Sequence, residues 1–83
     1  MQKERILIVE DEEHIAEGLR INLSLQGFDV LVATDGAKGL AAWRKFKPHL
    51  MVVDLMMPVM DGVQLVSHIR AEDEKVPTTT IVP

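Results

Sequence analysis

The chain has 83 residues, of which 47% are hydrophobic and 27% charged, and its net charge is −4. This composition is typical of a small globular domain, and the lack of a basic run argues against nucleic-acid binding by this segment. With no cysteine, neither a disulfide framework nor a thiolate metal site can form. The apolar run at residues 6–9 is too short for a signal peptide or a membrane span, so we expect a cytoplasmic location.

Strands and helices are predicted to alternate from the N-terminus onward. Residues 5–9 are a continuous apolar run rich in β-branched side chains, which indicates a buried strand. Residues 12–26 carry apolar side chains at helical spacing, and Gly27 is a plausible stop. A strand at residues 28–33, interrupted by one aspartate, is expected nearer a sheet edge than the other strands. A helix that ends near Phe46 follows it.

The second half of the chain repeats this alternation. An apolar strand, residues 50–53, ends at Asp54, and a helix is predicted over about residues 63–71. Residues 72–75 are interpreted as a solvated turn, and residues 76–83 as the start of a fourth strand. The strands should be parallel, because β-α-β crossovers are right-handed. The helical positions expected to face the core are Ile15, Ala16, Leu19 and Leu23, then Ala37, Leu40, Ala41 and Trp43, then Val63, Val66 and either Leu65 or Ile69.

Acidic residues follow two of the apolar strands. Glu10 and Asp11 come directly after the first, and Asp54 comes after the third. Parallel strands place their carboxyl ends at one sheet edge, so these acids converge if the two strands are neighbours. Clustered carboxylates repel one another unless a cation is present, and oxygen ligands alone favour Mg²⁺, Mn²⁺ or Ca²⁺. A carboxylate beside Mg²⁺ can attack phosphorus and form an aspartyl phosphate. Glu12 and Glu13 are interpreted as a solvated helix start rather than as ligands.

Three stretches of the sequence together resemble the receiver domain of two-component response regulators. They are Ile6-Leu7-Ile8-Val9-Glu10-Asp11-Glu12, then Asp54, then Met57-Pro58-Val59-Met60-Asp61-Gly62. The resemblance covers about residues 5–77. It implies a flavodoxin-like, doubly wound parallel α/β sheet of strand order 2-1-3-4-5. Residues 1–83 would be one C-terminally truncated receiver domain, with about four strands in the order 2-1-3-4 and three helices.

The resemblance also implies roles for the matching residues. Asp54 would be the phosphoacceptor, phosphorylated in the presence of Mg²⁺ (or Mn²⁺) by a sensor histidine kinase or a phosphotransfer protein. Asp11 and Asp54 would bind the metal, Glu10 would contribute directly or through water, and the backbone carbonyl of Met56 would be a further ligand. Such a module carries out only its own phosphorylation and dephosphorylation, so we expect no turnover of an external substrate. The supporting loop residues would be Met57, Pro58, Asp61 and Gly62.

The C-terminal end departs from the family pattern. Receivers carry Ser or Thr at the end of strand four, where this chain has Val82. A threonine from residues 78–80 could substitute only after a shift in register. The fourth helix, the fifth strand with its phosphate-binding lysine and the fifth helix have no counterpart in these 83 residues. The bare sheet edge and uncovered apolar face that result predict a homodimer or a domain swap.

Two other functions fit part of the pattern. One is a truncated or pseudo-receiver that acts only through dimer or partner contacts and does not switch, because the strand-four Thr and the strand-five Lys are missing. The other is an aspartate-nucleophile phosphatase, which needs a second acid two residues after the nucleophile. Met56 occupies that position, so the phosphatase is disfavoured.

Overall fold

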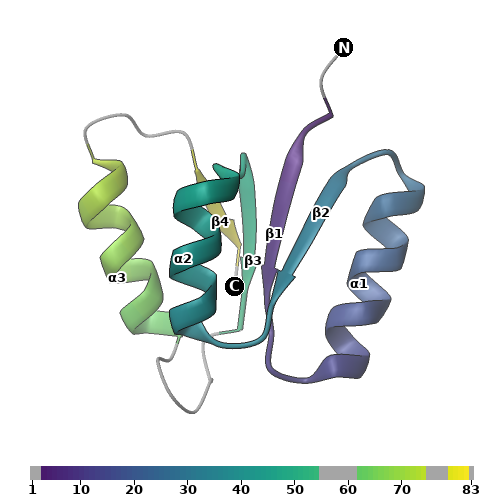
Figure 1. Ribbon diagram of the computed structural model, residues 1–83, viewed down its shortest axis with the longest axis horizontal. Coiled ribbons are helices and arrows are strands. Elements are labelled where there is room, and N and C mark those ends of the chain that lie inside the picture. The colour runs from purple at the N-terminus through teal and green to yellow at the C-terminus, as the bar shows by residue number, and fades with distance from the viewer. Residues whose placement is uncertain (1–2, 55–61, 75–78, 83) are drawn as a thin grey trace.

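The computed structural model describes residues 3–54, 62–74 and 79–82. Strands and helices alternate along it as predicted (Figure 1). No helix among these described residues is long and apolar enough to cross a membrane. The elements are β1 (Arg5–Val9), α1 (Glu13–Leu25), β2 (Asp29–Ala33), α2 (Gly36–Phe46), β3 (Leu50–Val53), α3 (Gly62–Asp73) and β4 (Thr80–Val82).

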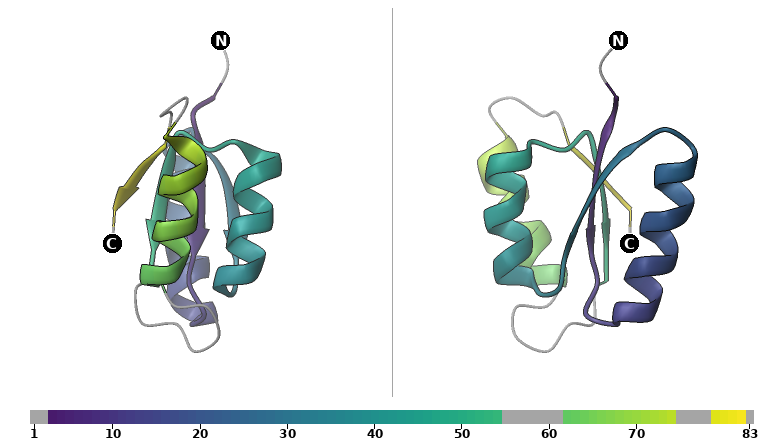
Figure 2. Two further views of the ribbon diagram at one scale, coloured as in Figure 1. Left: turned by 90° about the vertical axis from the view of Figure 1, so that its left-hand side faces the viewer. Right: turned by 45° about the vertical axis from the view of Figure 1, so that its right-hand side comes forward.

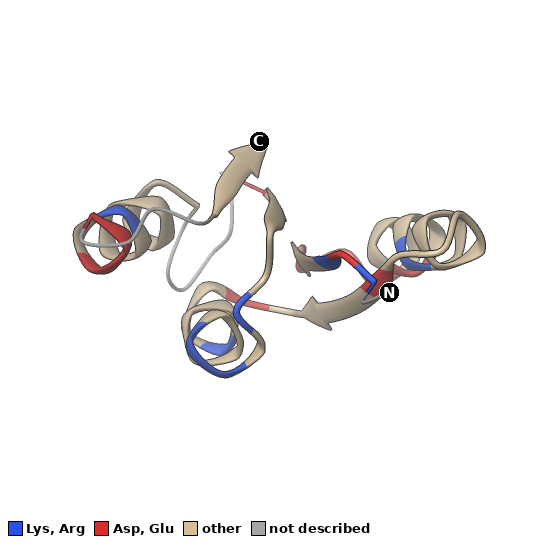
Figure 3. Cartoon of the chain, turned by 90° about the horizontal axis from the view of Figure 1, so that it is seen from above, with Lys and Arg blue, Asp and Glu red and all other residues tan. Residues whose placement is uncertain are grey.

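The four strands form one parallel sheet in the order β2-β1-β3-β4, which confirms the predicted order. Helices α2 and α3 cover one face and α1 lies on the other, as the view from above shows (Figure 3). In the described sheet β2 and β4 are the outer strands, and Figure 2 shows β4 at its edge. The last residue of β1, Val9, lies level with Ala33 of β2 and Val53 of β3. The carboxyl ends of these three strands therefore meet at one edge.

Side-chain and backbone caps define both ends of α2. Asp35 caps its first turn by accepting a hydrogen bond from the backbone N–H of Lys38 at 2.7 Å. At the other end Lys47 adopts the left-handed conformation, with φ of 50°. The guanidinium of Arg5 donates to the carbonyls of Phe46 and Lys47 at 2.8–3.0 Å. The start of β1 is thereby tied to the end of α2.

The main core lies between the sheet and the α2–α3 layer. Gly39 of α2 lies directly on β1, where an added Cβ would come within 2.9 Å of Val9 Cγ2. The opposite face of β1 is also buried, because α1 packs on β1 and β2. The residues of the main core are Leu7, Val9, Ala33, Met51, Val53, Leu65 and Ile69.

Several predicted details are wrong, and each has a local cause. The segment interpreted as a solvated turn begins as helix: α3 continues to Asp73, whose buried side chain accepts a hydrogen bond from Thr79 N–H at 3.1 Å. Ile15 is 53% exposed because α1 covers β1 and β2 rather than β3, and Val63 is 60% exposed. Two further helical positions expected to face the core are exposed as well: Ala37 and Ala41.

Candidate metal centre

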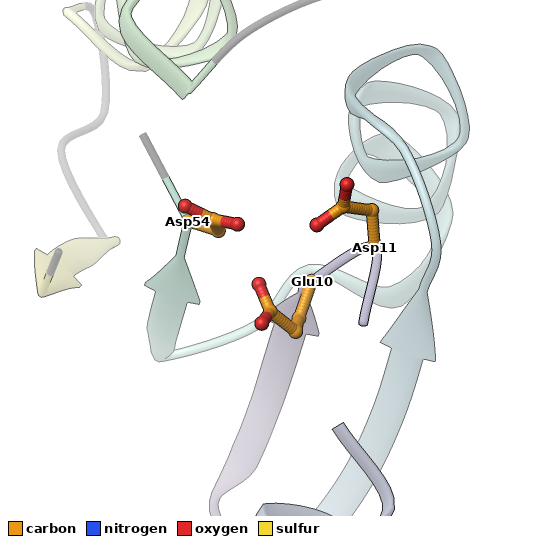
Figure 4. Close-up of side chains that lie close together, drawn as sticks. All are labelled: Glu10, Asp11 and Asp54. Carbon is orange, nitrogen blue, oxygen red and sulfur yellow. The ribbon is translucent and has the colours of Figure 1, made fainter. Parts of the chain in front are cut away.

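The acids that follow β1 and β3 meet at the carboxyl edge of the sheet. Glu10, Asp11 and Asp54 each offer a carboxylate oxygen, and these three oxygens lie within 4.8 Å of one another. Figure 4 shows the three carboxylates turned toward a shared space. The structure therefore brings together the three side chains that the strand order predicts to converge.

Backbone hydrogen bonds fix the main chain of two of these acids. The N–H of Asp54 donates to the carbonyl of Val9 at 2.9 Å, and the N–H of Glu10 donates to the carbonyl of Ala33 at 3.1 Å. Both bonds continue the sheet ladder one residue beyond the strands. The carboxylates are thus presented by a rigid scaffold, which is what a site with defined geometry requires.

The three acids differ in their access to water. Asp11 is exposed, Asp54 is half-buried and Glu10 is only 9% exposed. The pKa of Glu10 is raised from 4.5 to about 7, chiefly by burial and also by a side-chain hydrogen bond with Asp54 and the negative charges of Asp54, Asp11 and Glu12. At neutral pH the cluster therefore holds a proton part of the time, and a divalent cation would displace it.

A cavity of about 400 Å³ lies beside the cluster. Its walls are apolar, and Glu10 and Asp54 contribute the only acidic groups among the described residues that line it. The apolar lining residues are Ile8, Val9, Ile15, Leu19, Val52 and Val53.

The remaining predicted site residues fall into two groups. Gly62 is the buried first residue of α3. Glu12, interpreted as part of a solvated helix start rather than as a ligand, is exposed and caps α1, its side chain accepting a hydrogen bond from His14 N–H at 3.4 Å; it lies outside the three-acid cluster. Four residues lie outside the described part of the chain: Met56, Met57, Pro58 and Asp61.

The threonines before and within β4 lie at the wrong end of the strand to replace the missing hydroxyl. Thr80 is level with Leu50, four residues before Asp54, which corresponds to roughly 13 Å along a strand. Thr79 lies one residue further away, and Thr78 lies outside the described residues. Val82 is level with Val52 and supplies no hydroxyl. The structure therefore contradicts the possibility that Thr79 or Thr80 takes the place of the Ser or Thr that receivers carry at the end of strand four.

A polar network at the amino ends of β3 and β4 was not predicted. Thr79 is buried and its hydroxyl accepts a hydrogen bond from the indole Nε1–H of Trp43 at 3.0 Å. A buried tryptophan N–H normally needs an acceptor. Trp43 packs against the core as its helical spacing predicts, and the need of its indole N–H for an acceptor is the sequence signal that points to this network.

A parallel α/β sheet with an acidic cluster at its carboxyl edge is the architecture of receiver domains. The family model described as "Response regulator receiver domain" matches residues 6–82. The chain belongs to this family and is a receiver domain of the two-component response regulator type.

Similar curated proteins are transcriptional regulators. The chain is 42% identical over 74 residues to the probable transcriptional regulator ycf27 of Porphyridium aerugineum, covering 89% of this chain and 31% of that protein. It is 39% identical over 77 residues to the transcriptional regulatory protein PrrA of Mycobacterium tuberculosis, covering 93% of this chain and 33% of that protein. The chain thus spans about a third of the length of these relatives.

Solved structures agree with this family membership. The chemotaxis protein CheY4 of Vibrio cholerae superposes with a TM-score of 0.87 at 27% identity, covering 96% of this chain and 68% of that one. The response regulator TrrA of Thermotoga maritima, solved in complex with Mg²⁺ and BeF, gives 0.85 at 28% identity, covering 94% of this chain and 65% of that one. These likenesses confirm the flavodoxin-like class of the sheet.

Proposed function

We propose that Asp54 is the phosphoacceptor of this receiver domain and that Glu10, Asp11 and Asp54 together hold Mg²⁺ (or Mn²⁺). The observation that carries the proposal is the convergence of three carboxylate oxygens within 4.8 Å at the ends of neighbouring strands. All-oxygen donors suit a hard divalent ion. Receiver domains bind Mg²⁺ at an acidic pocket, and the similar TrrA was solved with Mg²⁺ and BeF, which supports the same use of this cluster.

The chemistry of the chain's own residues follows from their positions. One carboxylate oxygen of Asp54 attacks the phosphorus of a phosphohistidine, so that an O–P bond forms and the P–N bond breaks. The leaving histidine nitrogen takes up a proton. A bound Mg²⁺ supplies charge stabilisation for the phosphoryl oxygens. Asp54 is oriented by its backbone bond to Val9, and Glu10, whose pKa is raised, would have to lose its proton to serve as a ligand.

The proposed partner is a histidine kinase or a phosphotransfer protein, because receiver domains interact with proteins of these two kinds. Its phosphohistidine must reach Asp54 from solvent. Exposed Asp11 and half-buried Asp54 leave the acidic cluster open to approach at the sheet edge. We propose no turnover of an external substrate, since the aspartyl phosphate that forms is itself the product that carries the signal.

A small phosphodonor with Mg²⁺, read by intact mass, tests the proposal. The wild-type protein should gain the mass of one phosphoryl group, and the site of attachment should map to Asp54. The near-isosteric variant Asp54→Asn should gain none, while Glu13→Gln, which changes an exposed acid of α1 outside the cluster, should behave as wild type. An adduct that persists in Asp54→Asn would show that another residue is modified.

A second function, an interaction module that does not switch, is favoured by one observation. Val82 and Thr80 place no hydroxyl level with Asp54, so the described residues of β4 offer no side chain to sense a phosphoryl group there. Exposed apolar side chains, among them Ile15 of α1 and Val82 of β4, are available for such a module to form a homodimer or bind a partner. Sedimentation with and without BeF and Mg²⁺ separates the functions. A switching receiver changes its association state or its partner affinity on adduct formation, whereas a constitutive module does not.

A further inference from the structure

The edge strand β4 has little apolar anchorage of its own. None of its three residues is buried, and Val82 is 45% exposed. Ile81 alone among them packs against the main core. Thr79, which directly precedes the strand, is by contrast only 6% exposed. Among the described residues 79–82, the most deeply buried is therefore a polar one, Thr79.

Four polar contacts converge on Thr79. Its hydroxyl accepts a hydrogen bond from Trp43 Nε1–H at 3.0 Å and donates one to the carbonyl of Pro48 at 3.2 Å. Its backbone N–H donates to Asp73 Oδ2 at 3.1 Å, and its carbonyl accepts from Arg70 Nη1 at 3.4 Å. One residue thus joins the end of α2, the α2–β3 connection, the end of α3 and the start of β4.

The hydroxyl cannot be replaced there by water at low cost. Pro48 is fully buried, and Asp73 is 6% exposed. Removing the Thr79 hydroxyl leaves the partly buried indole N–H of Trp43 and the buried carbonyl of Pro48 without this partner, which is more costly than losing a surface hydrogen bond. Serine retains a hydroxyl that both donates and accepts, whereas valine keeps the shape of threonine and does neither.

The acidic cluster is attached to a different part of the sheet. Asp54 and Glu10 bond through their backbone N–H groups to Val9 and Ala33, in β1 and β2. The Thr79 contacts lie at the opposite end of the strands, since Thr80 pairs with Leu50. Opening the start of β4 therefore leaves the backbone bonds of the acidic cluster in place.

From this arrangement we propose that Thr79 is a latch that fastens β4 and the end of α3 to the domain. When the latch opens, β4 separates as a local unit while β2, β1 and β3 keep their pairing. The latch is a conformational device distinct from the acidic cluster. It does not depend on whether Asp54 is phosphorylated. The fluorescence emission of Trp43, whose indole N–H bonds to Thr79, reports whether the latch is formed.

Amide hydrogen exchange in Thr79→Val, with Thr79→Ser as the matched control, tests the latch. The Thr80 amide, which donates to the carbonyl of His49 at 3.1 Å, reports on β4, and the amides of Ile8 and Val9 report on β1. In Thr79→Val the Thr80 amide should exchange about ten- to a hundred-fold faster. The β1 amides should change by less than about two-fold, and Thr79→Ser should stay close to wild type. Trp43 emission should shift to the red in Thr79→Val only.

Each other outcome contradicts the proposal. Unchanged exchange at Thr80 in Thr79→Val would show that the network does not hold β4. Equal acceleration in β1 and β4, or complete unfolding of the variant, would show that the network supports the whole domain rather than a local unit. Trp43→Phe keeps the aromatic packing and removes only the indole N–H. It should accelerate the Thr80 amide several-fold with β1 unchanged, and failure to do so would also overturn the latch.

Discussion

Asp54 donates its backbone N–H to the carbonyl of Val9 at 2.9 Å, and Val9 is the residue immediately before Glu10. One hydrogen bond thus joins the carboxyl ends of β1 and β3, from which all three acids of the cluster follow. Displacement of either strand end would separate Asp54 from Glu10 and Asp11. The acidic cluster is for this reason a property of the sheet pairing and not of either acidic segment alone.

Mg²⁺ should stabilise the folded domain through this cluster. A ligand present at a hundred times its Kd adds about 2.7 kcal/mol to the free energy of unfolding when it binds only the folded state. Urea unfolding with Mg²⁺ and with a chelator measures this gain. Asp11→Asn should lose most of the gain because it removes a ligand, and Glu13→Gln should retain it. A full Mg²⁺ response in Asp11→Asn would remove Asp11 from the proposed ligands.

Without metal, Glu10 should make the domain less stable as the pH rises. Its folded-state pKa of about 7 exceeds the ordinary 4.5, so the folded protein binds the proton more tightly than the unfolded chain does. The resulting stabilisation is complete below pH 4.5 and is lost as the pH rises through about 7. Urea unfolding at several pH values with a chelator should show this decline in wild type, and the decline should be smaller in Glu10→Gln. Equal pH profiles for the two proteins would contradict the assigned shift.

Leu65 should contribute far more to stability than its neighbour on the same helix, Val63. Leu65 is fully buried in the core against α2 and the sheet, and Val63 is 60% exposed. Leu65→Ala should cost about 2–5 kcal/mol, and Val63→Ala should stay within about 0.5 kcal/mol. Denaturant unfolding measures both. Similar losses for the two variants would show that α3 is rotated about its axis relative to the structure.

The sequence predicts well those parts of the fold that depend on the local pattern of apolar and acidic residues along the chain. The short, β-branched apolar runs before Glu10 and Asp54 indicate buried strands, and continuous rather than alternating apolar residues are typical of a parallel sheet. Once the family resemblance gives the strand order, the acids that follow them must share an edge. For this reason the sequence predicts the location of the candidate site, while the metal and phosphoryl roles of its residues stay predictions.

The details that the sequence did not predict depend on partners far along the chain. Asp73 lies in an acidic run that resembles a solvated turn, yet it is buried because Thr79 N–H reaches it. Ile15 has the spacing of a core residue, yet it is exposed because α1 lies over β1 and β2. Burial of a polar group and exposure of an apolar one are both set by which elements come to lie beside it. The residues next to a position in a single sequence do not show which distant elements will pack against it.

Paramagnetic broadening by Mn²⁺ in amide NMR spectra tests most directly whether the three acids share one divalent ion. At low Mn²⁺ concentration the amides of Glu10, Asp11 and Asp54 should broaden together in wild type. Either Asp11→Asn or Asp54→Asn should weaken the broadening at both strand ends at once. Broadening confined to one strand end, or broadening at Glu10 and Asp11 that is unaffected by Asp54→Asn, would contradict a shared site.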